Sequence, residues 1–122
     1  MQLLEFVIAD DAQSYRRILR QIILSRPEWL VVGEAADGVE ALRLVAAHHP
    51  DIVLLEVNMP ELNGIEATRR IKQLAPETHV LVFSSYDEEE FRRESLLAGA
   101  DYFLRKEELD ADKLSNVLAH LA

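Results

Sequence analysis

Several side chains that can bind a metal ion or a phosphoryl group stand directly after apolar runs of the sequence. Carboxylate oxygens suit a hard cation such as Mg²⁺, whereas cationic side chains and hydroxyl groups can bind phosphoryl oxygens. The residues of these three kinds are Asp10, Asp11, Glu56, Ser84, Ser85, Arg105 and Lys106. If the fold brings them together, they form a site for phosphate and a divalent metal.

The spacing of apolar residues predicts strands that alternate with helices. Strands are expected over residues 3–9, 29–35, 52–55, 80–83 and 102–104. Helices are expected from residue 12 to near Pro27 and over residues 39–48, 65–74, 88–98 and 110–121. The strands are short apolar runs and the helices carry an apolar stripe, as in a sheet that is covered on both faces.

This alternation predicts a doubly wound α/β domain with a five-stranded parallel sheet, helices on both faces and right-handed crossovers. Ligands of such sheets bind at the carboxyl ends of the strands, near the point where the strand order reverses. With the order 2-1-3-4-5, the first, third, fourth and fifth strands are neighbours. The candidate groups would then meet at one edge of the sheet.

The composition favours one domain and excludes several functions. The chain has 122 residues, of which 49% are hydrophobic, and its formal net charge of -9 would repel nucleic acid and anionic membranes. It has no cysteine, so disulfides and thiolate metal sites are excluded. No signal peptide is evident, and no apolar run approaches the ~18 residues of a membrane helix. We therefore expect residues 1–122 to be one cytoplasmic domain without direct contacts to nucleic acid or membrane.

The candidate residues also have ordinary structural explanations. Asp11 is well placed to cap the first helix. Arg16, Arg17 and Arg20 fit the solvated face of that helix, and partner docking beside the acidic pocket is an alternative. What favours a functional site is the coincidence of suitable groups at four strand ends, because independent caps and surface charges have no reason to share one edge.

Other types of site have less support. The histidines lack the spacing of metal ligands, so we expect all of them at the surface or at its boundary. They are His48, His49, His79 and His120. Neither a phosphate-binding loop motif nor a glycine-rich dinucleotide motif is present, which argues against a nucleotide site.

The chain resembles the receiver domain of two-component response regulators over essentially its full length. The motifs that carry the resemblance are the pair Asp10-Asp11, the segment 51–64 (DIVLLEVNMPELNG), Ser84, and the run Gly99-Ala100-Asp101 leading to Phe103 and Lys106. The stretch 59–72 (MPELNGIEATRRIK) is particularly similar to receivers joined to a helix-turn-helix DNA-binding domain. The resemblance implies a flavodoxin-like fold and a phosphorelay switch in signal transduction.

Roles for individual residues follow from the resemblance. It implies that Lys106 contacts phosphoryl oxygens, that Ser84 bonds to the phosphoryl group and that Phe103 changes rotamer to reshape the surface around helix 88–98. The implied partner is a sensor histidine kinase or phosphotransfer protein, and the implied output domain, absent from this chain, regulates transcription. A homodimer would form through helix 88–98, strand 102–104 and helix 110–121. Mg²⁺ would be held by Asp10, Asp11, Glu56 and the backbone carbonyl of Asn58.

Glu56 is the departure from the family pattern, because it stands where the family has the phospho-accepting aspartate. One extra methylene moves the carboxylate by ~1.5 Å, and a misplacement of about 1 Å can cost on the order of a hundredfold in rate. We therefore expect impaired phosphorylation. Glu56 would instead reach towards Lys106 or the metal, weakening or replacing Mg²⁺ and acting as a partial mimic of the phosphoryl group.

Two alternatives from other classes stay open. A small Mg²⁺-dependent phosphatase or phosphotransferase would share the doubly wound fold, but such enzymes typically carry Asp-x-Asp after the first strand, whereas Asp10 and Asp11 are adjacent. A flavin carrier would need a first loop richer in Ser, Thr and Gly than residues 10–14. We expect a signalling module with at most self-phosphotransfer and autodephosphorylation, and not a turnover enzyme.

Overall fold

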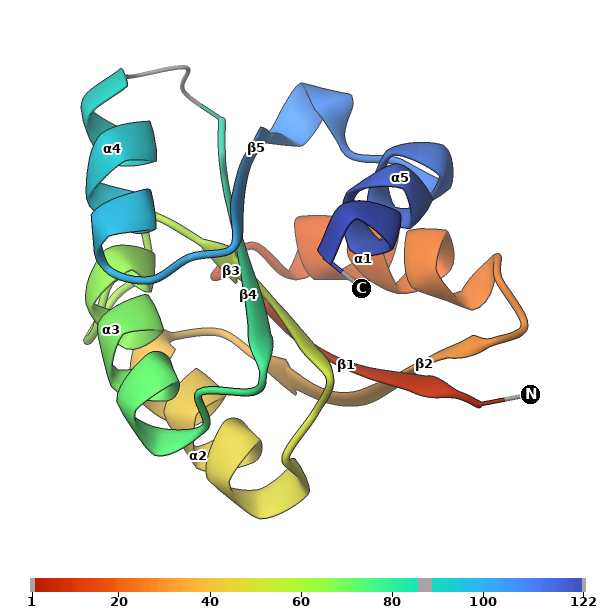
Figure 1. Ribbon diagram of the computed structural model, residues 1–122, viewed down its shortest axis with the longest axis horizontal. Helices are drawn as coiled ribbons and strands as arrows, with labels where there is room; N and C mark the ends of the chain where they lie inside the picture. Colours follow the sequence, from red (N-terminus) through yellow and green to blue (C-terminus); the bar gives the residue numbers. More distant parts are fainter. Residues whose placement is uncertain (1, 86–88, 122) are drawn as a thin grey trace.

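A five-stranded parallel sheet forms the centre of the structure, a computed structural model that describes residues 2–85 and 89–121 (Figure 1). The strand order is β2-β1-β3-β4-β5, which confirms the predicted order 2-1-3-4-5. Each observed strand overlaps a predicted one. The strands are β1 (Leu4–Ala9), β2 (Trp29–Ala35), β3 (Ile52–Glu56), β4 (His79–Ser84) and β5 (Tyr102–Arg105).

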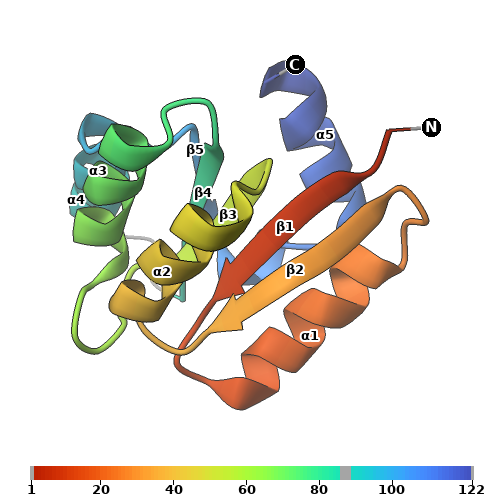
Figure 2. The same ribbon diagram turned by 90° about the horizontal axis from the view of Figure 1, so that it is seen from below.

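Helices cover both faces of the sheet, as Figures 1 and 2 show. One face is covered by α1 (Gln13–Leu24) and α5 (Ala111–Leu121). The other is covered by α2 (Gly38–His48), α3 (Gly64–Leu74) and α4 (Glu89–Leu97). Residue 88, where the fourth helix was predicted to begin, lies outside the described residues. None of the helices in residues 2–85 and 89–121 is both long enough and apolar enough to cross a membrane.

The central strands are apolar along their whole length because each contributes side chains to two cores. In β3, Val53 and Leu55 pack on the α2–α4 face, whereas Ile52 and Leu54 pack on the α1 and α5 face. All four side chains are almost completely buried. Alternation of this kind removes the polar positions that an exposed sheet face would show, so the strand reads as a continuous apolar run.

The beginning of α1 differs from the prediction. The N-cap residue is Ala12, which makes no side-chain cap, so the prediction that Asp11 caps this helix is wrong. Asp11 is exposed, and the neighbouring Asp10 accepts a hydrogen bond from the Ala12 backbone N–H at 2.8 Å through Oδ1. The buried carboxylate thus organises the turn between β1 and α1, because its backbone is fixed at the end of a central strand.

Two short features at the carboxyl edge were not predicted. β3 extends to Glu56, one residue beyond the predicted strand, which fixes the backbone of Glu56 in the sheet. A 3-10 turn, η1 (Lys106–Glu108), follows β5, and Glu108 accepts a hydrogen bond from the Arg105 backbone N–H at 3.0 Å. This turn is too short to produce the apolar periodicity on which the prediction relied.

Candidate acidic site at the carboxyl edge of the sheet

Three charged side chains from separate strand ends meet at one point. Lys106 Nζ lies 2.8 Å from Asp10 Oδ2 and 3.2 Å from Glu56 Oε1. Asp10 follows β1, Glu56 ends β3 and Lys106 follows β5, so the parallel strand order brings them to one edge. We call this group the acidic site.

Asp10 is fully buried and is held through both its side chain and its backbone. The Arg16 guanidinium donates a hydrogen bond of 2.6 Å to the Asp10 carbonyl oxygen. Glu34 on β2 lies 3.8 Å from Arg16 and accepts a hydrogen bond of 2.6 Å from Arg20. The prediction that Arg16, Arg17 and Arg20 form a solvated face is therefore confirmed for Arg17, which is exposed, and for the Arg20 side chain, which is 43% exposed. It is wrong for Arg16, whose side chain is 18% exposed.

The backbone around Glu56 is restrained by a close approach of α3. Glu56 Oε2 accepts a hydrogen bond of 3.1 Å from the Val57 backbone N–H. The Gly64 N–H donates to the Val57 carbonyl at 2.8 Å, and a Cβ at Gly64 would lie 2.0 Å from the Glu56 carbonyl oxygen. Only glycine fits this position. The first residue of α3 thus packs directly against the strand end that carries Glu56.

Burial and charge act against each other in the acidic site. Burial raises the pKa of Glu56 above its ordinary 4.5, and the Lys106 ammonium opposes this rise only in part. Burial disfavours the ammonium form of Lys106, but the hydrogen bond that the ammonium donates to Asp10 and the charges of Asp10 and Glu56 outweigh this effect, so the pKa of Lys106 is raised above 10.5. The site therefore favours a charged Lys106 and holds its carboxylates by means of that charge.

Two aromatic rings, which the sequence reading did not connect with the site, also contact Lys106. Its Nζ lies 4.3 Å from the centre of the Tyr15 ring and 5.7 Å from that of Phe83. The Tyr15 hydroxyl donates a hydrogen bond of 3.3 Å to the Lys106 carbonyl oxygen. Burial, followed by the charges of Asp10 and Glu56, raises the pKa of Tyr15 to about 12. The only sequence signal was that Tyr15 falls in the first turn of the helix that follows the acidic pair.

The remaining candidate residues are Asp11, Asn58, Ser84 and Phe103. Asp11 and Asn58 are exposed. Ser84 is fully buried at the end of β4 and pairs in register with Arg105 of β5. Phe103 is buried on the α2–α4 face of the sheet, with the Arg92 guanidinium 5.5 Å from the centre of its ring.

The donor atoms of the acidic site fit Mg²⁺ without forming a complete protein cage. No group of three His, Cys, Asp or Glu side chains suited to a metal occurs within residues 2–85 and 89–121. Mg²⁺, however, usually binds through only one or two carboxylates together with water. Asp10 and Glu56 supply two carboxylates that already converge on a cation, the Lys106 ammonium. The predicted surface or boundary positions of the histidines are confirmed: His48, His49 and His120 are exposed and His79 is partly exposed.

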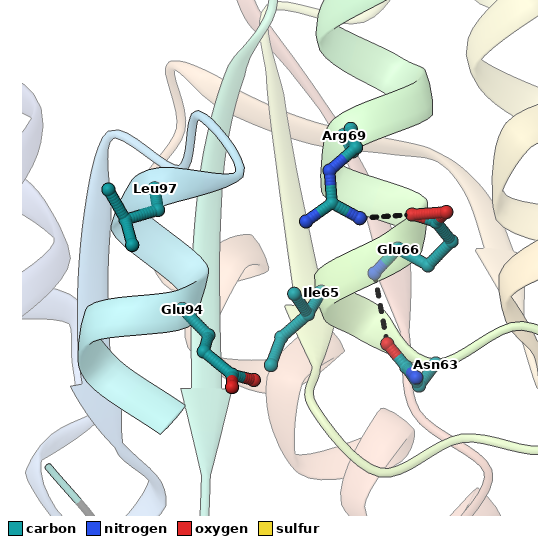
Figure 3. Close-up of a pocket in the computed structure, with 6 residues that line it drawn as sticks. All are labelled: Asn63, Ile65, Glu66, Arg69, Glu94 and Leu97. Atoms are coloured by element: carbon teal, nitrogen blue, oxygen red, sulfur yellow. Dashed lines mark hydrogen bonds and ion pairs between the residues drawn. The ribbon is translucent and has the colours of Figure 1, made fainter. Parts of the chain in front are cut away.

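A hollow that several charged side chains line lies elsewhere, between α3 and α4 (Figure 3). It has a volume of about 570 Å³ and contains no residue of the acidic site. Ile65 and Glu94 line it from opposite helices, and Glu66 on its wall pairs with Arg69. The acidic site is thus a cluster of charges at the sheet edge and is separate from this hollow.

Comparisons with known proteins agree with this architecture. The family described as the response regulator receiver domain matches residues 6–119. The transcriptional regulatory protein DegU of Brevibacillus brevis is 41% identical over 111 residues, which cover 91% of this chain and 47% of DegU. The solved receiver domain of the response regulator NarL from Mycobacterium tuberculosis is 31% identical, with a TM-score of 0.91 over 98% of this chain and 96% of that one.

A third similar chain was solved as part of a complex. It is a chain of the solved CheX-CheY complex with BeF3 and magnesium from Borrelia burgdorferi, which is 28% identical with a TM-score of 0.87 over 97% of this chain and 88% of that one. The chain spans about half the length of the curated transcription regulators that it matches, with 47%, 49% and 51% of them covered. On the family match, the identity to DegU and the shared strand order, this chain belongs to the receiver domain family of two-component response regulators, which act as phosphorylation-dependent switches.

Proposed function

We propose that residues 1–122 form a single receiver domain in which Glu56 occupies the phospho-acceptor position and serves as a partial mimic of a phosphoryl group. The observation that carries this proposal is the contact between Glu56 Oε1 and Lys106 Nζ at 3.2 Å. A carboxylate there places negative charge beside the ammonium that would otherwise contact phosphoryl oxygens. A phosphoryl group carries about -1.5 to -2 charges, so one carboxylate supplies only part of this charge.

The candidate residues at and near the acidic site would divide the work of phosphoryl transfer in the following way. Lys106 orients and neutralises the phosphoryl oxygens, and the Ser84 hydroxyl bonds to the transferred group. A bound Mg²⁺ would supply further neutralisation of the charge on those oxygens. It would be held by Asp10, Asp11, Glu56 and the backbone carbonyl of Asn58.

Glu56 should be a poor acceptor because its backbone is fixed in β3 while its carboxylate is one methylene longer than that of aspartate. The reacting oxygen then lies about 1.5 Å beyond the position that an aspartate would give it. The same extra length lets Glu56 reach Lys106. The extra methylene that lets Glu56 mimic a phosphoryl group therefore also impairs its phosphorylation. The Glu56–Lys106 contact would in addition weaken or replace the binding of Mg²⁺.

The output of the switch would be the surface formed by α4, β5 and α5. A rotamer change of Phe103, which is buried beside α4 in this structure, would reshape that surface and support a homodimer. We propose a cytoplasmic module that receives its signal from a sensor histidine kinase or phosphotransfer protein. It would regulate transcription through a separate output domain, without contacting nucleic acid or membrane itself, and without turnover of a substrate.

Intact-mass measurement after incubation with acetyl phosphate and Mg²⁺ tests the acceptor assignment. The chain and its Glu56→Asp variant should be compared, and the variant alone should gain a phosphoryl adduct. An adduct on both would mean that Glu56 or another residue still accepts phosphate. An adduct on neither would contradict the proposed acceptor position.

Mimicry needs a separate test, since a blocked acceptor need not resemble a phosphorylated one. A shift from a 1:99 to a 99:1 ratio of two states needs about 5.5 kcal/mol of differential stabilisation, so a partial shift is expected from one carboxylate. Amide NMR spectra of the chain should lie between those of Glu56→Asp without and with beryllofluoride. Spectra identical to those of untreated Glu56→Asp would show that Glu56 does not bias the switch.

A further inference from the structure

The Tyr15 ring lies unusually close to the Lys106 ammonium for a residue that only packs in the core. The distance of 4.3 Å from Lys106 Nζ to the Tyr15 ring centre is the shortest cation–ring contact recorded within residues 2–85 and 89–121. The contacts of Arg92 with Phe103 at 5.5 Å and of Lys113 with Tyr102 at 5.7 Å are longer.

The Tyr15 hydroxyl adds a second connection to the same residue. It donates to the Lys106 backbone carbonyl at 3.3 Å, across a sequence separation of 91 residues. Helix α1 is thereby joined to the start of η1, the segment that carries Lys106. One tyrosine thus contacts both the charged end and the backbone of Lys106.

The aromatic surroundings limit where the ammonium can go. The Lys106 side chain is only 18% exposed, and the Tyr15 and Phe83 rings, 5.6 Å apart, both lie within 6 Å of its Nζ. A ring face attracts a cation without offering it a proton acceptor, and the attraction grows as water is excluded. The Tyr15 ring therefore stabilises the ammonium where it stands while leaving its protons to Asp10 and Glu56.

We infer that Tyr15 is a positioning residue that holds the Lys106 ammonium between Asp10 and Glu56, and that α1 thereby controls how readily a divalent cation competes for the two carboxylates. The ammonium and Mg²⁺ are both cations that the Asp10 and Glu56 oxygens attract, so a firmly held ammonium lowers the affinity for the metal. The positioning of Lys106 by Tyr15 does not depend on the proposed function, whereas the effect of this positioning on the phosphorylation switch rests on it.

The test compares Tyr15→Leu, which removes the ring, with Tyr15→Phe, which keeps the ring and loses the hydroxyl. Tyr102→Leu is the matched control, because Tyr102 is also a partly buried tyrosine with a lysine beside its ring. The chain has three lysines, Lys72, Lys106 and Lys113, so the ammonium signals can be resolved by heteronuclear NMR and assigned with Lys106→Arg. Calorimetric titration with Mg²⁺ provides a second readout.

We expect a protected Lys106 ammonium signal in the unchanged chain, in Tyr15→Phe and in Tyr102→Leu, and its loss through solvent exchange in Tyr15→Leu. Tyr15→Leu should also bind Mg²⁺ about threefold to tenfold more tightly, as expected when a partly desolvated cation–ring contact is lost. If circular dichroism shows that Tyr15→Leu is unfolded, Tyr15→Met replaces it in both measurements.

A Tyr15→Leu chain with both the protected signal and unchanged Mg²⁺ affinity would reduce Tyr15 to a packing residue. The proposed competition between the ammonium and Mg²⁺ would be wrong if Tyr15→Leu lost the signal but bound Mg²⁺ equally or more weakly. It would also be wrong if the signal were lost and no variant bound Mg²⁺ detectably. Failure of Glu56→Asp to accept phosphate would instead count against the proposed function. Because neither readout here uses phosphorylation, the two failures can be distinguished.

Discussion

At the scale of the residue, two buried carboxylates lie close together, and the positive charge of Lys106 compensates their negative charges. Asp10 is fully buried and Glu56 is 5% exposed. Removal of one member of a buried ion pair is costly because the remaining charge has lost both water and partner. The Lys106 ammonium therefore offsets part of the cost of burying the two carboxylates, and its removal should destabilise the chain.

Replacement of Lys106 by Met should lower the free energy of unfolding at neutral pH by about 3 kcal/mol, because Asp10 and Glu56 are left uncompensated. Urea titration measures this change. Lys113→Met is the control, with an expected loss of no more than about 1 kcal/mol for one cation–ring contact. Equal losses in the two variants would show that the Lys106 charge has no special role.

The loss caused by Lys106→Met should shrink as the pH falls. Burial raises the pKa of Glu56 in the folded chain above 4.5, so the folded state binds this proton more tightly than the unfolded state does. The stability that comes from this difference is fully present below pH 4.5 and is lost as the pH rises through the folded pKa. Protonation of Glu56 also removes the charge that Lys106→Met leaves uncompensated. Urea titrations of both chains over this range should therefore give similar free energies of unfolding at the acid end, and a constant difference would contradict the assignment.

Tyr15 should ionise later than an ordinary tyrosine. Burial, and then the charges of Asp10 and Glu56, raise its pKa from 10.0 to about 12. The stability that Tyr15 contributes in this way is present below pH 10.0 and is lost as the pH rises through about 12. In an ultraviolet titration of the three tyrosines, Tyr15→Phe should remove the latest component, and Glu56→Gln should shift that component to lower pH. A latest component that persists in Tyr15→Phe would belong to another tyrosine.

At the scale of the element, the carboxylates are positioned by the close packing of strand ends and helix starts. Asn63 caps α3 by accepting a hydrogen bond of 2.9 Å from the Glu66 backbone N–H through Oδ1. The next residue, Gly64, then packs against the backbone of Glu56. The start of α3 and the end of β3 are therefore positioned together, and a change at one should be felt at the other.

Gly64→Ala should destabilise the chain by about 1–3 kcal/mol or more, because its Cβ would meet backbone atoms that cannot move aside independently. The control is Gly33→Ala, whose Cβ would meet only the movable end of the Leu44 side chain at 3.0 Å. Thermal unfolding of both variants measures the difference. NMR of the Lys106 ammonium group should also change in Gly64→Ala alone, and an unchanged signal would show that α3 does not position Glu56.

At the scale of the whole molecule, the net charge of -9 is large for 122 residues. Repulsion among like charges disfavours the compact state and is screened by salt. The ion pairs of the acidic site are buried, so salt should weaken them much less than it weakens the repulsion across the surface.

Stability should therefore rise as the ionic strength increases from about 0.01 M, where the screening length is ~30 Å, to about 0.15 M, where it is ~8 Å. Urea titrations at the two salt concentrations measure this change, with sodium chloride as the salt and magnesium excluded. A fall in stability would show that attraction between exposed opposite charges, such as Arg26 and Asp112, outweighs the general repulsion.

The sequence was sufficient for the architecture because the architecture depends on local patterns. Short apolar runs located all five strands, and their alternation with helices predicted that the strands are parallel, whereas the order 2-1-3-4-5 was assumed for the doubly wound fold and is confirmed by the structure. The end of α4 could also be predicted from the sequence. The helix ends at Leu97, and Gly99 follows with a φ of 109°, which favours glycine. The meeting of Asp10, Glu56 and Lys106 could be anticipated, since the carboxyl ends of neighbouring parallel strands share one edge.

What only the tertiary structure decided is how side chains from distant segments pair at that edge. Tyr15 fits the apolar stripe of α1, but this pattern does not reveal that its ring contacts Lys106, because that contact depends on how α1 lies against the sheet. The same placement directs Arg16 to the Asp10 carbonyl and leaves Asp11 exposed without a capping role. Periodicity determines which residues face a core, whereas the contacts among polar side chains depend on distances between elements that the pattern of one element does not contain.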